Sequence, residues 1–177
     1  MHPRSFLAAF WAAAAVLLAV RLASADVSPA LTNAIVLMSK VPSYHMSMTT
    51  PEGVAETDVS NPGKMHTVMK VGEMYLIGPT MYMKISGKWT KFANSNNNSD
   101  VLARYHKFAS NYSSQDLGMR TVPSGTFHAY AVHDTTHPNV KNTIYLDGSG
   151  RIARMDIDAS VVTFSRYGVP VSIQPPM

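Results

Sequence analysis

The chain contains no cysteine among its 177 residues. This absence excludes a disulfide framework, a thiol nucleophile, a zinc–thiolate site and lipid attachment to a cysteine. Charge is also sparse, because charged residues make up 15% of the sequence and the formal net charge is +4. A nucleic-acid-binding protein needs a clustered basic stripe, so no nucleic-acid partner is expected.

No hydrophobic run is long enough to cross a membrane, and the longest one lies near the first residue. An apolar run of fifteen residues follows Arg4, which is shorter than the roughly 18 to 20 residues that cross a bilayer. The small residues Ala23 and Ala25 then match a signal-peptidase site. We expect residues 1–25 to be a cleaved secretory signal peptide. Residues 26–177 are expected to form a single domain, not membrane-spanning, in the periplasm or outside the cell.

Catalytic motifs are absent as well. The sequence has no GxSxG nucleophile elbow, no phosphate-binding glycine loop and no HExxH metal motif. We therefore expect neither an enzyme activity nor a cofactor. His133, Asp134 and His137 lie close together at the end of an expected strand. They form either a surface site for a divalent ion or three solvent-exposed side chains.

The residues that are present predict a helix, a series of antiparallel strands, a second helix and more strands. Ser28 and Pro29 are typical of a helix start, and apolar residues recur three and four positions apart until Pro42. Alternating segments separated by turn residues then indicate hairpins. We expect strands at 43–50, 54–60, 64–71, 74–78, 80–85, 88–92, 125–134, 141–159 (with a turn at 147–150) and 161–176.

The second expected helix covers residues 101–112. A polar loop at 94–100 precedes it, Asp100 is a suitable cap, and Tyr105, Phe108 and Tyr112 recur at helical spacing. We expect this helix to lie across the sheet as a lid.

Methionine is the residue in excess, with eleven copies after residue 25. Six of them lie on like faces of successive expected strands: Met46, Met48, Met65, Met69, Met81 and Met83. Methionine fills irregular cores, but a flexible thioether wall also suits a binder that repacks around varied acyl chains. The pattern therefore indicates either a plain core or an adaptable apolar cavity.

Copper is the third interpretation of the methionines. Thioethers and imidazoles are soft ligands for Cu(I), and the chain offers Met46 and Met48 beside His45, and Met81 and Met83 near Trp89. Any buried strand face also produces the same spacing of two residues. On a strand, His45 points away from its methionine neighbours, so the local pattern does not assemble a complete ligand set.

Several short motifs resemble the LolA/LolB-like family, which includes LppX- and LprG-like proteins. They are SYHMSMTT after the first helix, Gly72-x-x-Tyr75-x-x-Gly78, the pair MYMK and Gly-Lys-Trp, the hairpin IYLDGSGRIARMDI and the closing VTFSRYGVPVSIQPP. The resemblance implies an α+β fold, a curved antiparallel β half-barrel with two helices packed on its concave side. It also implies binding of a lipid, an acyl chain or a lipoprotein in the cell envelope.

Two features depart from that family. The missing cysteine means that the chain is not itself an anchored lipoprotein, which favours a soluble carrier. No arginine has the context of the one with which the lipoprotein carrier controls its opening, so apolar-ligand binding is a firmer implication than lipoprotein sorting.

The expected function is an exported carrier of a lipid or another apolar molecule, with a lipoprotein or another envelope protein as a further partner. Lys84, Lys88 and Lys91 are candidates to meet an anionic headgroup at the rim. A copper(I)-binding protein and a ligand-free interaction domain are the alternatives. The expected ligand-binding residues are Met46, Met48, Met65, Met69, Met81, Met83, Trp89, Tyr105 and Phe108.

Overall fold

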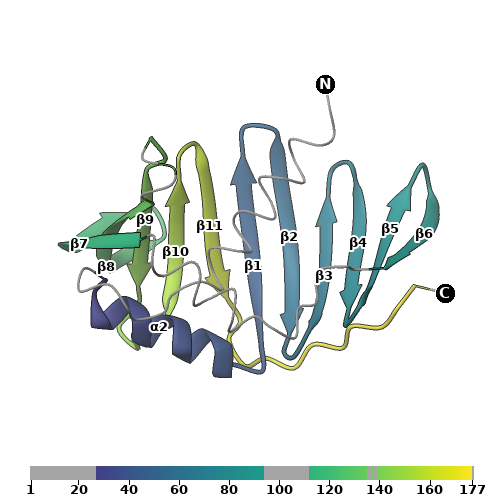
Figure 1. Ribbon diagram of the computed structural model, residues 1–177, viewed down its shortest axis with the longest axis horizontal. Helices are drawn as coiled ribbons and strands as arrows, with labels where there is room; N and C mark the ends of the chain where they lie inside the picture. Colours follow the sequence, from purple (N-terminus) through teal and green to yellow (C-terminus); the bar gives the residue numbers. More distant parts are fainter. Residues whose placement is uncertain (1–26, 94–111, 135–136, 138, 177) are drawn as a thin grey trace. The chain divides into compact units, whose positions relative to one another are not determined.

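The computed structural model describes residues 27–93, 112–134, 137 and 139–176 (Figure 1). These residues form one helix and eleven strands, and the strand pairs are antiparallel. The chain divides into two compact units. Unit 1 comprises Met1–Lys40 and Val101–Thr163, and unit 2 comprises Val41–Asp100 and Phe164–Met177.

Unit 1 begins with the helix α2 (Pro29–Lys40), as the sequence predicts. The Ser28 hydroxyl accepts a hydrogen bond from the Ala30 amide at 3.3 Å, so Ser28 caps the first turn. The helix ends two residues before Pro42. It packs against β10 and buries one apolar stripe, which consists of Leu31, Ala34, Ile35 and Met38.

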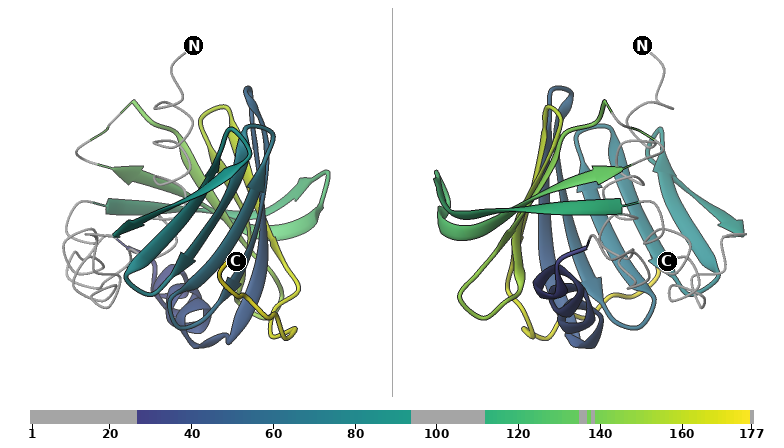
Figure 2. Two further views of the ribbon diagram at one scale, coloured as in Figure 1. Left: turned by 90° about the vertical axis from the view of Figure 1, so that its right-hand side faces the viewer. Right: turned by 60° about the vertical axis from the view of Figure 1, so that its left-hand side comes forward.

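Five strands follow in unit 1, in the spatial order β11-β10-β9-β8-β7. They are β7 (Tyr112–Val122), β8 (Gly125–Asp134), β9 (Asn142–Leu146), β10 (Ile152–Ile157) and β11 (Ser160–Ser165), whose last two residues belong to unit 2. Strands β7 and β8 form a long hairpin that projects from the rest of unit 1 (Figure 2).

The sequence pattern missed β7. Its register shifts between Asp116 and Gly118, so a bulge interrupts the alternation that a strand prediction depends on. Tyr112 was expected in the second helix, and this prediction is wrong because Tyr112 pairs with Asp134 at the start of β7. The remaining residues of that helix, including Tyr105 and Phe108, lie outside the described residues.

Unit 2 contains six consecutive strands in the order β6-β5-β4-β3-β2-β1. They are β1 (Ser43–Thr50), β2 (Gly53–Ser60), β3 (Lys64–Met69), β4 (Gly72–Ile77), β5 (Thr80–Ile85) and β6 (Lys88–Ala93). The predicted strands of this segment are confirmed to within two residues at each end. Short turns join neighbours in the sheet, so alternation and turn chemistry were sufficient to find them.

The last segment of the chain differs from the prediction. Strand β11 ends at Ser165, and no strand continues through residues 166–176. Arg166 has φ 51° and Gly168 has φ 73°, which breaks the extended backbone before Pro170. The segment instead turns back within unit 2, where the Gly168 amide donates to the Ser43 carbonyl at 2.8 Å and the Ser43 hydroxyl donates to the Val169 carbonyl at 2.5 Å.

The predicted antiparallel α+β class is confirmed. The prediction of two packed helices is met in part, because the described residues contain α2 and no second helix. Within the same part of the chain, no helix has the length and apolar character needed to cross a membrane.

Candidate functional site

One face of the unit 2 sheet carries six of the nine predicted site residues. Residues directly opposite each other on paired strands share a face, and the register runs from Met46 through Thr57, Thr67 and Met74 to Met83. We call this surface the methionine face. Its apolar members include Met46, Met48, Ala55, Met65, Met69, Met74, Leu76, Met81 and Met83, and Phe92 on β6.

The methionine face becomes more open from β1 towards β6. Met46 and Met48 on β1 are each 2% exposed, and Met74 on β4 is 1% exposed. Met81 and Met83 on β5 are half-buried, and Phe92, opposite Met81 on β6, is 36% exposed. Most of the face on β1 to β4 is therefore a closed core, with Met69 on β3 half-buried, whereas the β5–β6 end offers several apolar side chains at a surface.

Two buried hydroxyls interrupt the methionine face. Thr57 and Thr67 are fully buried, and their side-chain oxygens are hydrogen-bonded to each other at 3.1 Å. Each threonine thus satisfies the other, and the face presents methyl groups at this position. An apolar ligand on this face would meet no unpaired hydroxyl here.

The six predicted methionines share this face, as the alternation indicated. Met74 and Leu76 belong to it as well and were not among the predicted residues. The signal was present, because Met74 lies directly across the β4–β5 pair from Met83 and Leu76 across from Met81. A count of the residues in the turn between the two strands would have found both.

Trp89 lies on the opposite face of the sheet, which corrects its predicted grouping with the methionines. The two-residue turn Ser86-Gly87 pairs Ile85 with Lys88, Lys84 with Trp89 and Met83 with Thr90. Trp89 therefore shares the face of Lys84. The sequence placed Trp89 near the methionines, but only the register of the hairpin decides on which side its indole lies.

On that opposite face Trp89 belongs to an aromatic cluster. Its ring meets Tyr75 edge-on, with ring centroids 5.5 Å apart, and Tyr75 stacks on His66 at 4.1 Å. The ammonium of Lys84 lies 5.6 Å from the Trp89 ring, within the range of a cation–π contact. Three strands thus contribute one continuous ring surface beside a lysine.

Glu73 holds the polar side of the aromatic cluster together. His66 Nε2 contacts Glu73 Oε1 at 2.9 Å, and the Tyr75 hydroxyl donates to the same oxygen at 3.2 Å. The hydrogen bond from His66 holds the pKa of Glu73 below its usual value. Burial, and then the Glu73 charge, raise the pKa of Tyr75. Glu73 is therefore a carboxylate and Tyr75 a neutral phenol at neutral pH.

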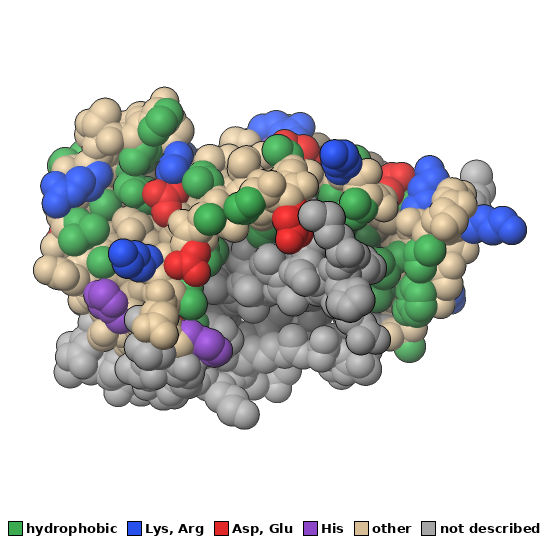
Figure 3. Space-filling model, turned by 90° about the horizontal axis from the view of Figure 1, so that it is seen from above, with side chains coloured by type: hydrophobic (Ala, Val, Ile, Leu, Met, Phe, Trp, Pro, Cys, Tyr) green, Lys and Arg blue, Asp and Glu red, His purple; other side chains and the backbone are tan. Residues whose placement is uncertain are grey.

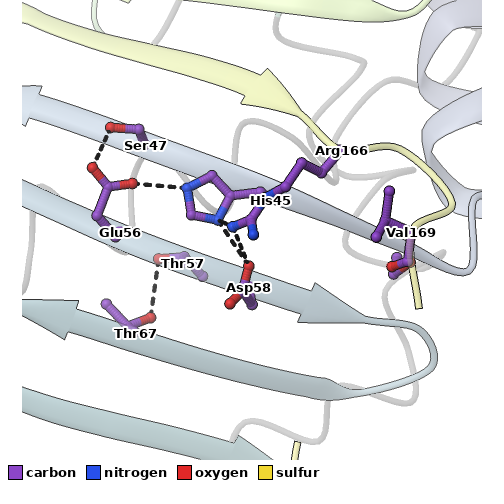
Figure 4. A network of polar contacts seen from close by, with 9 residues as sticks. His45, Ser47, Glu56, Thr57, Asp58, Thr67, Arg166 and Val169 are labelled. Carbon is purple, nitrogen blue, oxygen red and sulfur yellow. Dashed lines mark hydrogen bonds and ion pairs between the residues drawn. The ribbon is translucent and has the colours of Figure 1, made fainter. Parts of the chain in front are cut away.

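A second polar network lies on the same face, over β1 and β2 (Figure 4). Both ring nitrogens of His45 contact carboxylates at 2.8 Å, Nδ1 with Asp58 and Nε2 with Glu56. The Ser47 hydroxyl donates to Glu56 at 2.9 Å, and the Arg166 guanidinium donates to Asp58 at 2.9 Å and also contacts His45. The network joins the residue that follows β11 to the first hairpin.

These positions separate the residues of both expected copper sets. His45 faces away from Met46 and Met48 and is held by two carboxylates, and Trp89 faces away from Met81 and Met83. Of the residues expected at a divalent-ion site, His137 contacts Asp134 at 3.0 Å, and Asp134 is buried, whereas His133 is its neighbour on β8 and points to the other side of the sheet. Among the described residues, no three His, Asp or Glu side chains are grouped so that they could hold a metal ion.

No protein-family model and no curated protein matches the chain. Solved structures do match. The lipoprotein LppX from Mycobacterium tuberculosis has a TM-score of 0.61 at 16% identity, over 82% of this chain and 96% of that one. LprF from Mycobacterium bovis has a TM-score of 0.57 at 17% identity, over 85% and 99%.

A LolA superfamily protein from Nitrosomonas europaea also matches, with a TM-score of 0.33 at 10% identity over 85% of this chain and 96% of that one. The likeness to LppX and LprF shows that the chain has an LppX-like fold, which confirms the fold that the resemblance to LppX-like proteins implied.

Proposed function

We propose that this protein is an exported carrier that binds a lipid, or the acyl chains of a lipoprotein, on the methionine face of unit 2. The LppX-like fold supports the proposal, as does the signal-peptide pattern of the first 25 residues. We further propose that the protein works in the periplasm or outside the cell and binds its ligand without covalent chemistry.

The observation that carries the proposal is the change in exposure along the methionine face. The face is buried over most of β1 to β4, but it leaves Met81, Met83 and Phe92 partly open at β5 and β6. Thioether side chains adapt to irregular partners, so the open end suits chains of different length and shape. Leu76 and Met65 on the adjoining strands are buried and extend the same surface inward.

The energetics fit an acyl chain. Each methylene removed from water contributes about 0.8 kcal/mol, so ten buried methylenes contribute roughly 8 kcal/mol before the entropic cost of binding. A face with satisfied hydroxyls at Thr57 and Thr67 adds no desolvation cost from unpaired groups. Such a site binds the acyl chain through the apolar surface area that is buried, and its specificity for the headgroup is low.

The test is native mass spectrometry of the exported protein purified from its host, followed by solvent extraction. We expect a co-purifying lipid in the wild type and in Met81→Leu/Met83→Leu, because leucine keeps the apolar volume. We expect the lipid to be lost in Met81→Glu/Met83→Glu, which places two charges on the methionine face. Thr80→Glu is the matched control, since Thr80 precedes Met81 on β5 and points to the opposite face.

Two results would contradict the proposal. One is the absence of lipid from the wild type. The other is equal lipid binding in the glutamate variants and the Thr80→Glu control. Stoichiometric uptake of Cu(I), lost in the leucine variant, would instead support the copper alternative, because leucine is apolar but has no sulfur to bind the metal.

A further inference from the structure

The basic charge of this protein is concentrated in one part of unit 2. Residues 64–93, which form β3 to β6, contain five lysines and one acidic residue, Glu73. Their formal net charge of +4 equals that of the entire chain. All five lysines are exposed, namely Lys64, Lys70, Lys84, Lys88 and Lys91. This end of unit 2 therefore presents a positive surface, and the rest of the chain has no net charge.

The β5–β6 hairpin combines that charge with exposed apolar side chains. Its turn reads Lys84-Ile85-Ser86-Gly87-Lys88, and Ile85 is 49% exposed between the two lysines. Phe92, on the same face as Ile85, is 36% exposed. At the end of Figure 3 that corresponds to β5 and β6 in Figure 1, basic and hydrophobic side chains lie close together.

The opposite face of the hairpin adds rings with one polar end. Trp89 and Tyr75 are half-buried and in edge contact, and Tyr82 lies directly opposite Tyr75 on β5. Tryptophan and tyrosine suit the boundary between lipid headgroups and acyl chains, because the ring is apolar and the N–H or O–H is polar. The long lysine side chains reach past such rings to charged headgroups.

We propose that the β5–β6 hairpin docks the protein on an anionic lipid membrane. Lys84 and Lys88 contact the headgroups, and Ile85 at the turn inserts at the interface between headgroups and acyl chains. The positive charge complements an anionic leaflet, which attracts basic segments within a Debye length. Lysines on the edge strand β6 also discourage the addition of a strand from another protein, so the surface fits a membrane better than a β-strand partner.

The docking places the open end of the methionine face near the membrane. Met81 and Met83 lie on the strand that leads directly into the docking turn, so a lipid leaving the bilayer has a short path to them. In this respect the inference rests on the proposed function. Docking itself needs no bound ligand, and the two proposals can therefore fail separately.

The experiment is flotation of the exported protein with vesicles, after its mass has shown that residues 1–25 are gone. The vesicles contain phosphatidylcholine alone or phosphatidylcholine with phosphatidylglycerol. We expect binding to the anionic vesicles only. Lys84→Gln/Lys88→Gln should weaken this binding about 30-fold, and Ile85→Ser about tenfold. Lys141→Gln is the matched control, an exposed lysine in unit 1 whose change should leave binding within about twofold of the wild type.

Trp89 supplies a second readout, because it is the only tryptophan after residue 25. Its emission should shift to the blue on anionic vesicles, in the wild type and in the Lys141→Gln control. Equal binding to neutral and anionic vesicles overturns the docking proposal, as does a loss in Lys141→Gln that matches the loss in Lys84→Gln/Lys88→Gln. Vesicle binding with these hairpin effects, but with no co-purified lipid, supports docking and contradicts the carrier function.

Discussion

At the scale of single residues, the buried pair Thr57 and Thr67 is the polar exception within the methionine face. Both side chains are fully buried. Among the described residues, the hydroxyl of each threonine is hydrogen-bonded to the hydroxyl of the other, at 3.1 Å. A buried hydroxyl without a partner costs about 1–3 kcal/mol, whereas a satisfied hydrogen bond contributes about 0.5–1.5 kcal/mol. The two positions should therefore be strongly coupled.

We predict that Thr57→Val lowers the free energy of unfolding by about 1–3 kcal/mol, because it leaves the Thr67 hydroxyl buried and unpaired. The double variant Thr57→Val/Thr67→Val should be close to the wild type, since valine has nearly the same shape and no orphaned donor remains. Urea denaturation of the two single variants and the double variant measures the coupling. Additive losses in the double variant would show that the hydroxyl bond does not stabilise the fold.

At the scale of elements, the β5–β6 hairpin decides which side chains share a face. Ser86 has φ 50° and Gly87 has φ 80°, so both turn residues are left-handed, as a type I′ turn requires. This two-residue turn pairs Lys84 with Trp89 and thus sends the indole away from Met83. One more residue in the turn would reverse that arrangement.

We predict that Gly87→Ala destabilises the protein by about 1 kcal/mol, because a residue with a Cβ is strained at positive φ. Space is not the cause, since a Cβ at Gly87 would meet no atom within 4 Å. Ser86→Asn should not destabilise, as asparagine followed by glycine is the preferred pair in this turn.

Gly148→Ala is the matched control for Gly87→Ala. A Cβ at Gly148 also meets no atom within 4 Å, and Gly148 does not have a positive φ. Thermal unfolding of the three variants should show a loss for Gly87→Ala alone. An equal loss of stability in Gly148→Ala would mean that the left-handed backbone at Gly87 is not the reason for the destabilisation.

At the scale of the whole molecule, the end of the chain completes unit 2. Ser43 and Val169 are 126 residues apart in sequence but share a hydrogen bond, and Arg166 adds an ion pair with Asp58. Further along, Ile173 is 3% exposed although it belongs to no strand. The closing segment is therefore packed as part of the fold.

We predict that Ile173→Ala lowers the free energy of unfolding by about 2–5 kcal/mol, the range for truncating a buried isoleucine. Val169→Ala is the control, because Val169 is 48% exposed and truncation there should cost about 0.5 kcal/mol or less. Urea denaturation followed by Trp89 fluorescence monitors unit 2. A cost for Ile173→Ala as small as that of the control would show that the segment is not part of the cooperative fold.

The sequence by itself determined the elements whose signals are local. The helix α2 follows from its cap and its apolar spacing, and β1 to β6 follow from alternation between turns. The same alternation indicated that Met46, Met48, Met65, Met69, Met81 and Met83 share a face, and the register confirms it. Neighbouring residues alone set these features, so no contact from elsewhere in the chain was needed.

Tertiary structure decided the features that depend on pairing. The bulge between Asp116 and Gly118 hid β7 from the pattern, and the hydrogen bonds with Ser43 turn the final segment away from the expected strand. The hairpin register placed Trp89 on the other face of the sheet from the methionines. Packing left Met83 half-buried, whereas Met46 is fully buried. How deeply a side chain is buried, and where the end of the chain packs, depend on residues distant in sequence. A local pattern carries no information about them.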